Sequence, residues 1–132
     1  MKKTKQLSST ELSQIIIEGM HEKKANEVVL MDLRKINNAV TDFFVICSGN
    51  SDTQIDAIAK SVEGLVDKKT GQNAWNREGK TQREWILLDY VDVVVHVFKS
   101  DKRGFYDIES LWGDADITYF GDDMKPTKEL VN

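Results

Sequence analysis

The chain has 132 residues, of which 40% are hydrophobic and 30% are charged, so it fits one domain with a real core and leaves little room for a second. The single cysteine, Cys47, excludes an internal disulfide, and one Cys with two His at no short spacing makes a zinc site improbable. The net charge is −4, no signal peptide follows the N-terminal lysines, and no apolar run approaches the roughly 20 residues of a membrane span, so we expect a cytoplasmic protein without membrane contact.

Two helices are predicted in the first half of the chain. Ser8-Ser9-Thr10-Glu11 and Ser51-Asp52-Thr53-Gln54 both have the capping-box pattern, in which two side chains satisfy two backbone N–H groups at a helix start. Apolar residues at helical spacing then predict helices over about 9–23 and from about 52 to a point before Gly71.

Strands are predicted where apolar residues run together. Val28–Met31 and Phe43–Cys47 are continuous apolar runs, which indicate strands covered on both faces, as in a sheet with helices on each side. Trp85–Asp89 and Val93–Phe98 are separated by three residues and predict an antiparallel hairpin. Residues 72–83 could hold a short edge strand.

The last predicted element is a helix over about 102–111, followed by an acidic, turn-rich segment. We therefore expect a single α/β domain over 7–115, with a mixed sheet flanked by helices, and a flexible acidic tail over 116–132.

Two features could carry chemistry. Ser48-Gly49-Asn50-Ser51 lies between a strand and a helix start, where anions bind, although a tight turn with a helix cap is the more common explanation of such a sequence. Acidic residues near strand ends could hold magnesium or simply serve turns: Asp32, Asp42, Asp89 and Asp92. Together these features keep open a nucleotide-binding enzyme that uses magnesium.

His96 and Cys47 are interpreted as packed residues. Period-2 alternation puts Val93, Val95 and Val97 on one face of their strand and Val94, His96 and Phe98 on the other. A lone histidine in such a run is most often a packed or hydrogen-bonded residue, and Cys47 lies in an apolar run as a small core residue.

Aromatic residues gather between Trp85 and Trp112, interleaved with acidic ones. The aromatic members are Trp85, Tyr90, Phe105, Tyr106 and Trp112. Residues 1–83 carry 13 Lys and Arg against 11 Asp and Glu, whereas residues 84–132 carry 5 against 11. Aromatic anchors within a charged rim are typical of protein contacts, and an acidic surface disfavours nucleic acid and favours a basic partner.

Two blocks of sequence carry a family resemblance. The first is Asp42-Phe43-Phe44-Val45-Ile46-Cys47-Ser48-Gly49-Asn50-Ser51 with Gln54, Ala57, Ile58 and Ala59 after it, and the second comprises residues 85–90, 92–98 and 105–112. Over roughly Leu7 to Ala115 the chain resembles the ribosomal silencing factor family, also called RsfS or Iojap.

The resemblance implies a nucleotidyltransferase-like fold with no catalytic residues, no metal and no cofactor. It also implies a homodimer when free, and binding to the large ribosomal subunit at ribosomal protein number fourteen. There the protein would block joining of the small subunit and repress translation under nutrient limitation. The partner-binding residues that it implies are Trp85, Leu88, Asp89, Tyr90, Asp92, Tyr106, Leu111 and Trp112.

Two positions inside that surface depart from the family pattern. Val91 stands where the family usually has Gly in the hairpin turn, and a β-branched residue resists positive φ, so a different or strained turn is expected. Gly104 replaces a bulkier residue and weakens the start of the last helix. Besides the enzyme, a dimeric scaffold for another basic protein is the remaining alternative.

Overall fold

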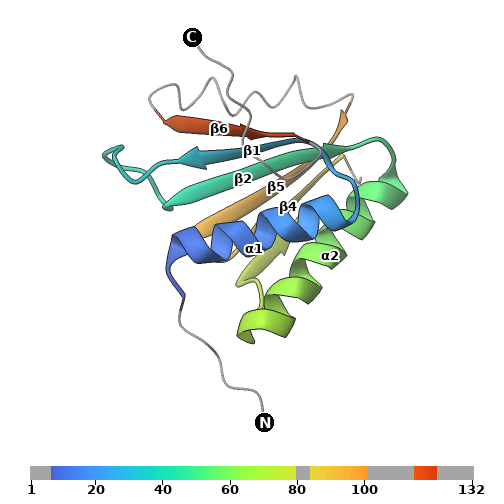
Figure 1. Cartoon of the computed structure of the whole chain (residues 1–132), viewed down its shortest axis with the longest axis horizontal. Helices are drawn as coiled ribbons and strands as arrows, with labels where there is room; N and C mark the ends of the chain where they lie inside the picture. The colour runs from blue at the N-terminus through green and yellow to red at the C-terminus, as the bar shows by residue number, and fades with distance from the viewer. Residues whose placement is uncertain (1–6, 80–83, 101–114, 122–132) are drawn as a thin grey trace.

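The computed structural model describes residues 7–79, 84–100 and 115–121. These residues form α1 (Ser9–Glu22), β1 (Asn26–Asp32), β2 (Phe43–Gly49), α2 (Asp52–Thr70), β3 (Asn76–Glu78), β4 (Trp85–Asp89), β5 (Val93–Lys99) and β6 (Asp116–Phe120). The strands make one sheet in the order β3-β4-β5-β2-β1-β6 (Figure 1). Only β2 and β5 pair in parallel, so the predicted mixed sheet is confirmed, as are the β4–β5 hairpin and the edge strand β3.

The start of α1 is capped as predicted. The Ser8 hydroxyl accepts the Glu11 N–H at 3.1 Å, and the Glu11 carboxylate accepts the Ser8 N–H at 3.1 Å. Each bond satisfies a backbone donor that the first turn of a helix leaves without a partner.

The start of α2 differs from the predicted capping box. The Ser51 hydroxyl accepts the Gln54 N–H at 3.1 Å, but the Gln54 side chain does not return the bond to Ser51. Its Oε1 accepts the Asn50 N–H at 2.7 Å, and its Nε2 donates to the carbonyls of Lys23 and Lys24. The Gln54 amide accepts one hydrogen bond and donates two, whereas a carboxylate could only accept. Its donated bonds tie α2 to the loop after α1.

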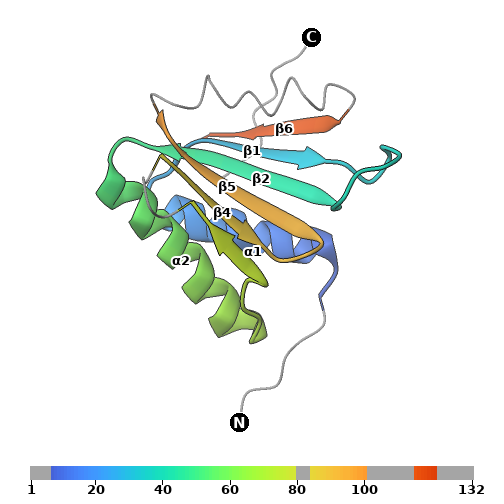
Figure 2. The same cartoon turned by 180° about the vertical axis from the view of Figure 1, so that it is seen from behind.

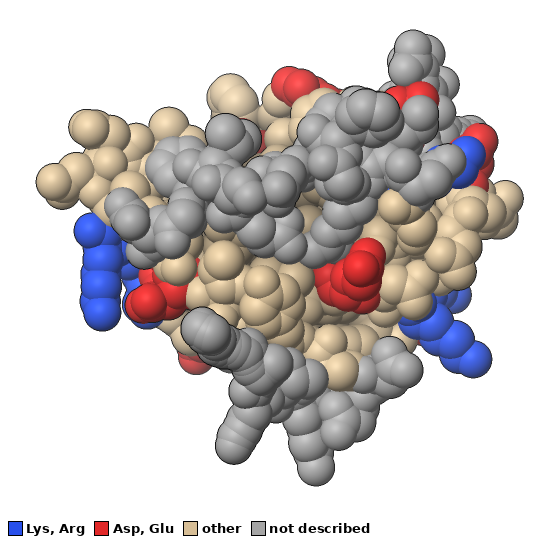
Figure 3. Space-filling view, turned by 90° about the horizontal axis from the view of Figure 1, so that it is seen from above, with Lys and Arg blue, Asp and Glu red and all other residues tan. Residues whose placement is uncertain are grey.

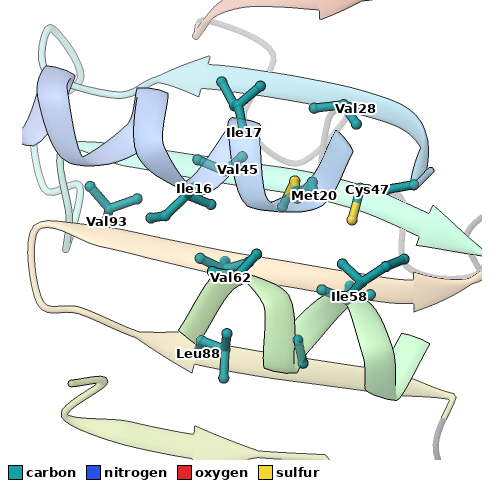
Figure 4. Packing of buried hydrophobic residues seen from close by; sticks show 14 of the residues in the cluster. Ile16, Ile17, Met20, Val28, Val45, Cys47, Ile58, Val62, Leu88 and Val93 are labelled. Atoms are coloured by element: carbon teal, nitrogen blue, oxygen red, sulfur yellow. The ribbon is translucent and has the colours of Figure 1, made fainter. Parts of the chain in front are cut away.

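Both described helices pack on the same face of the sheet (Figures 1 and 2). They approach closely at Gly19, where a Cβ would lie 3.0 Å from the Val62 Cα, and the Ser61 hydroxyl donates to the Gly19 carbonyl at 2.7 Å. The side chains between helices and sheet include those in Figure 4, namely Ile16, Ile17, Met20, Val28, Val45, Cys47, Ile58, Val62, Leu88 and Val93. Among the described helices, none is long and apolar enough to cross a membrane.

The opposite face of the sheet carries a second apolar cluster, made of Val29, Met31, Leu33, Phe44, Ile46, Val94 and Phe98. The two clusters explain why all seven residues of β2 are buried. Val93, Val95 and Val97 belong to the first cluster and Val94 and Phe98 to the second, so the predicted alternation of β5 is confirmed. Helices were predicted on both faces; the two described ones share one face, and the predicted helix over 102–111 lies outside the described residues.

Residues 116–120, which were predicted to belong to a flexible tail, form β6 instead. This strand pairs antiparallel with β1 in a register that sets Val28 opposite Phe120 and Asp32 opposite Asp116. Ile117 packs against the second cluster and Phe120 against the first. Ile, Thr, Tyr and Phe in succession favour a strand, and pairing with β1 outweighs the acidic surroundings.

Candidate functional site

The predicted partner-binding residues of β4 are divided between its two faces. Ile86, Leu88 and Tyr90 point into the core under the helices; Leu88 is fully buried and Tyr90 is 6% exposed. Trp85 and Leu87 lie on the other face, packed against the second cluster and only partly buried. The sequence prediction therefore included two core residues and missed Leu87, although period 2 along the strand groups Leu87 with Trp85 and Asp89.

Trp85 is held by a neighbouring side chain of β5. Its indole Nε1–H donates to His96 Nδ1 at 3.2 Å, and the two rings lie at 16° to one another with centroids 6.2 Å apart. Phe98 lies against both rings, with its centroid 5.9 Å from that of His96 at 7° and 6.2 Å from that of Trp85 at 15°, while Phe44 meets His96 edge-on at 4.9 Å. The orientation of Trp85 is thereby fixed from within the sheet.

His96 is neutral at physiological pH. It is 6% exposed, and burial lowers its pKa from 6.5 to about 4. Because Nδ1 accepts from Trp85, the proton of the neutral ring is on Nε2, which is buried without a hydrogen-bond partner among the described residues. The interpretation of His96 as a packed, hydrogen-bonded residue is confirmed.

The turn between β4 and β5 is strained at Val91, as expected from its β-branched side chain. Val91 has φ 75°, and the Asp92 N–H donates back to the Tyr90 carbonyl at 2.9 Å, which closes a tight turn of three residues. Asp92 is not among the described residues with positive φ, so this is not the type I′ turn common in two-residue hairpins.

Neighbouring groups hold this turn in place. The Asp89 carboxylate accepts the Val91 N–H at 2.8 Å, and the Thr41 hydroxyl donates to the Val91 carbonyl at 2.9 Å. The Asp92 carbonyl accepts the N–H groups of Asp42 and Phe43. The Asp92 side chain itself is exposed, whereas that of Asp89 is partly buried.

A hollow of about 340 Å³ opens beside this turn, lined by Val40, Trp75, Asp89, Val91 and Val94. Val40 and Trp75 were not singled out from the sequence. Both lie in connections, where no periodic pattern marks an exposed apolar residue, so only the fold reveals their proximity to the hairpin.

The two features that could carry enzyme chemistry lie at opposite ends of the sheet. Asp32 pairs with Phe43 and Asp89 with Val94, next to the start of β2, whereas Gly49 ends that strand. A seven-residue strand separates the two ends by about 20 Å. Figure 2 shows the β2–α2 connection on the left and the β4–β5 turn on the right. Within the described residues, no three His, Cys, Asp or Glu side chains gather into a metal site, and Asp32 pairs with Arg34 at 2.8 Å.

The remaining predicted partner-binding residues, Tyr106, Leu111 and Trp112, lie outside the described residues, as do Phe105 and Gly104. Figure 3 shows acidic side chains standing among uncharged ones on the side of the molecule seen from above, with Lys and Arg at its margins.

Comparison with known proteins identifies the family. A family described as "Ribosomal silencing factor during starvation" matches residues 6–130. The chain is 41% identical over 109 residues to the ribosomal silencing factor RsfS of Halalkalibacterium halodurans, covering 83% of this chain and 92% of that protein. It is 42% identical over 96 residues to RsfS of Bacillus subtilis, covering 73% and 80%.

Solved structures agree in fold. A crystal structure of a Chromobacterium violaceum protein superposes with a TM-score of 0.76 at 33% identity, covering 81% of this chain and 88% of that one. A second, from Bacillus halodurans, gives a TM-score of 0.69 at 39% identity, covering 79% and 95%. With the match spanning nearly every residue, the chain belongs to the ribosomal silencing factor family.

Proposed function

We propose that this protein binds the large ribosomal subunit at ribosomal protein number fourteen and prevents the small subunit from joining. In this proposal it acts in the cytoplasm, represses translation under nutrient limitation, and is a homodimer when free. The observation that carries the proposal is the match to the silencing factor family across residues 6–130.

The proposed contact surface is the face of β4 turned away from the helices, together with the hairpin turn. It comprises Trp85, Leu87, Asp89 and Asp92, with Tyr106, Leu111 and Trp112 carried over from the family resemblance. Trp85 supplies a partly exposed aromatic anchor whose orientation is already fixed, which lowers the entropy cost of binding. Leu88 and Tyr90 contribute as core residues that support this surface.

A steric block requires no catalytic group, since the factor needs only to occupy a surface that the small subunit also needs. Acidic side chains at the rim suit a basic ribosomal protein and accelerate docking. The proposal also includes a fold similar to that of nucleotidyltransferases. The alternative enzyme would need a phosphate-binding turn beside a pair of carboxylates, and these lie at opposite ends of β2.

The test is cosedimentation of the purified protein with large subunits on a sucrose gradient. Trp85→Ala combined with Asp92→Lys should abolish comigration, because the pair removes the aromatic anchor and reverses a rim charge. Asp92→Lys alone is the cleaner variant, since its side chain is exposed while Trp85 also packs inside.

The matched control is Glu22→Lys, which makes the same change of charge at an exposed position near the end of α1. It should cosediment like the wild type. Thermal unfolding of each variant checks the fold. Wild-type comigration by a folded double variant would sink the surface assignment.

A further inference from the structure

Three exposed apolar side chains surround one hollow at the hairpin end of the sheet. Val40 is 82% exposed, Trp75 76% and Val91 59%, and the hollow of about 340 Å³ that they line is completed by Asp89 and Val94. Single exposed apolar residues are ordinary, but a cluster around a concave site marks a contact surface. We call these five residues the hairpin groove.

The walls of the hairpin groove are held by hydrogen bonds between segments far apart in the sequence. The Trp75 N–H donates to the Asp89 carbonyl at 2.7 Å, which holds the loop before β3 against β4. Next to Val40, the Thr41 hydroxyl donates to the Val91 carbonyl at 2.9 Å. The groove is therefore formed before any partner arrives, and such preorganisation favours binding.

Val91 is the strained wall of the groove. A β-branched residue at φ 75° lies in a sparsely populated region, and such strain persists only where the surrounding structure imposes it. The side chain is 59% exposed, so burial within this chain does not offset the strain. Hydrogen bonds from the Val91 N–H to Asp89 and from Thr41 to the Val91 carbonyl hold the strained backbone, and they leave the apolar side chain exposed for contact outside the chain.

The charge and size of the hairpin groove define which kind of ligand would fit it. The lining has one carboxylate, Asp89, with the exposed Asp92 close by in the turn, and it contains no Lys or Arg. Its volume is at the lower end of small-molecule pockets, and a single charged side chain among apolar ones offers few groups to orient a small ligand. A large apolar side chain next to a cationic one matches both properties.

We propose that the hairpin groove docks a segment of a basic protein partner, which inserts one large apolar side chain between Val40, Trp75 and Val91 and sets a Lys or Arg beside Asp89 and Asp92. The inference rests on the proposed function, and the partner is a protein of the large subunit. It extends the contact surface to two loops outside the β4 face, so that the partner engages two sides of the hairpin.

Val91→Gly gives the sharpest test, because it should raise the stability of the fold and lower the affinity for large subunits. Gly accepts positive φ, so relief of strain should raise the unfolding temperature by a few degrees. Removal of the apolar wall should weaken large-subunit binding several-fold. A residue with a purely structural role would not lose affinity while gaining stability.

Trp75→Ala should weaken binding at least about tenfold, as expected for an aromatic anchor. Tyr119→Ala is its control, since it also removes an exposed aromatic ring, but from β6. Asp89→Asn keeps the acceptor for the Val91 N–H and removes only the charge. Its loss of affinity relative to the wild type should therefore become smaller as the salt concentration rises. Glu22→Gln is the matched neutralisation away from the groove.

The outcomes separate the inference from the function it depends on. If Asp92→Lys weakens cosedimentation while Val91→Gly and Trp75→Ala bind like the wild type, the groove inference fails and the proposed function stands. If the wild type does not bind large subunits, both fail. If the groove variants change only the oligomeric state, measured by light scattering, the occupant is a second copy and the inference is overturned.

Discussion

Tyr90 carries a hydroxyl into the core under the helices. The residue is 6% exposed, and its hydroxyl is buried without a hydrogen-bond partner among the described residues. Burial raises the pKa of the phenol well above its usual range. The ring contributes packing, whereas the hydroxyl costs free energy because it gave up its bonds to water.

Tyr90→Phe should therefore raise the free energy of unfolding by about 1 kcal/mol, since it removes the buried hydroxyl and keeps the ring. Urea denaturation measures this change. The same variant should cosediment with large subunits like the wild type, because Tyr90 lies in the core. A folded Tyr90→Phe protein that lost affinity would assign the hydroxyl to the partner contact after all.

His96 makes stability depend on pH. In the unfolded chain its pKa is near 6.5, and in the folded protein burial lowers the pKa to about 4. Between these values the unfolded state binds more protons, so stability is complete above pH 6.5 and falls as the pH drops towards 4. The difference between these two pKa values corresponds to at most roughly 3 to 4 kcal/mol of stability.

His96→Asn should flatten this part of the stability profile, because the amide does not titrate, while its Oδ1 can still accept the Trp85 indole N–H. Urea unfolding between pH 4.5 and 7 compares the two proteins, and His21, the other histidine, is common to both. Parallel profiles for wild type and variant would contradict the buried, neutral state of His96.

At the scale of elements, β6 completes the sheet next to β1. It covers the edge of β1 through five register pairs, and Ile117 packs near the buried Met31. Pairing and packing of this kind stabilise both strands, which a flexible tail would not do.

A chain ended after Ala115 should be less stable than one ended after Gly121 by about 2 kcal/mol or more, from lost apolar burial alone. Thermal and urea unfolding of the two truncated proteins give the difference. Equal stability would mean that β6 adds nothing to the fold.

Elements whose hydrophobic pattern is local could be predicted from the sequence. α1 with its cap, the β4–β5 hairpin and the alternation of β5 all follow from spacing within one segment. The cap of α2 could not be predicted in this way, because the Gln54 side chain donates to carbonyls in the loop after α1, 30 and 31 residues away. Long-range contacts of this kind override a four-residue motif.

Only part of the candidate surface could be predicted, because the rest also depends on contacts between segments far apart in the sequence. Trp85 and Asp89 lie on the face turned away from the helices, as a contact surface requires, whereas Leu88 has the opposite parity and is buried. Val40 and Trp75 line the same hollow as Val91 only because hydrogen bonds from the Thr41 hydroxyl and the Trp75 N–H hold their loops to the hairpin. The strain at Val91 was expected from its side chain, but not the hollow beside it.

The two described helices cover one face of the sheet, and the proposed contacts occupy the other face and the hairpin end. In the proposed function, the helix-covered core sets stability while the opposite face meets the partner. The geometry points to a basic and partly apolar partner segment, and the proposed function takes that partner to be a protein of the large ribosomal subunit.

Whether the bound factor prevents subunit joining can be measured in an order-of-addition experiment. Purified large subunits are incubated with the protein before small subunits are added, and light scattering follows formation of assembled ribosomes. We expect joining to fall in proportion to bound wild-type protein and to be restored with Asp92→Lys, at the same salt concentration. Full joining on large subunits that demonstrably carry the protein would show that it does not block the small subunit.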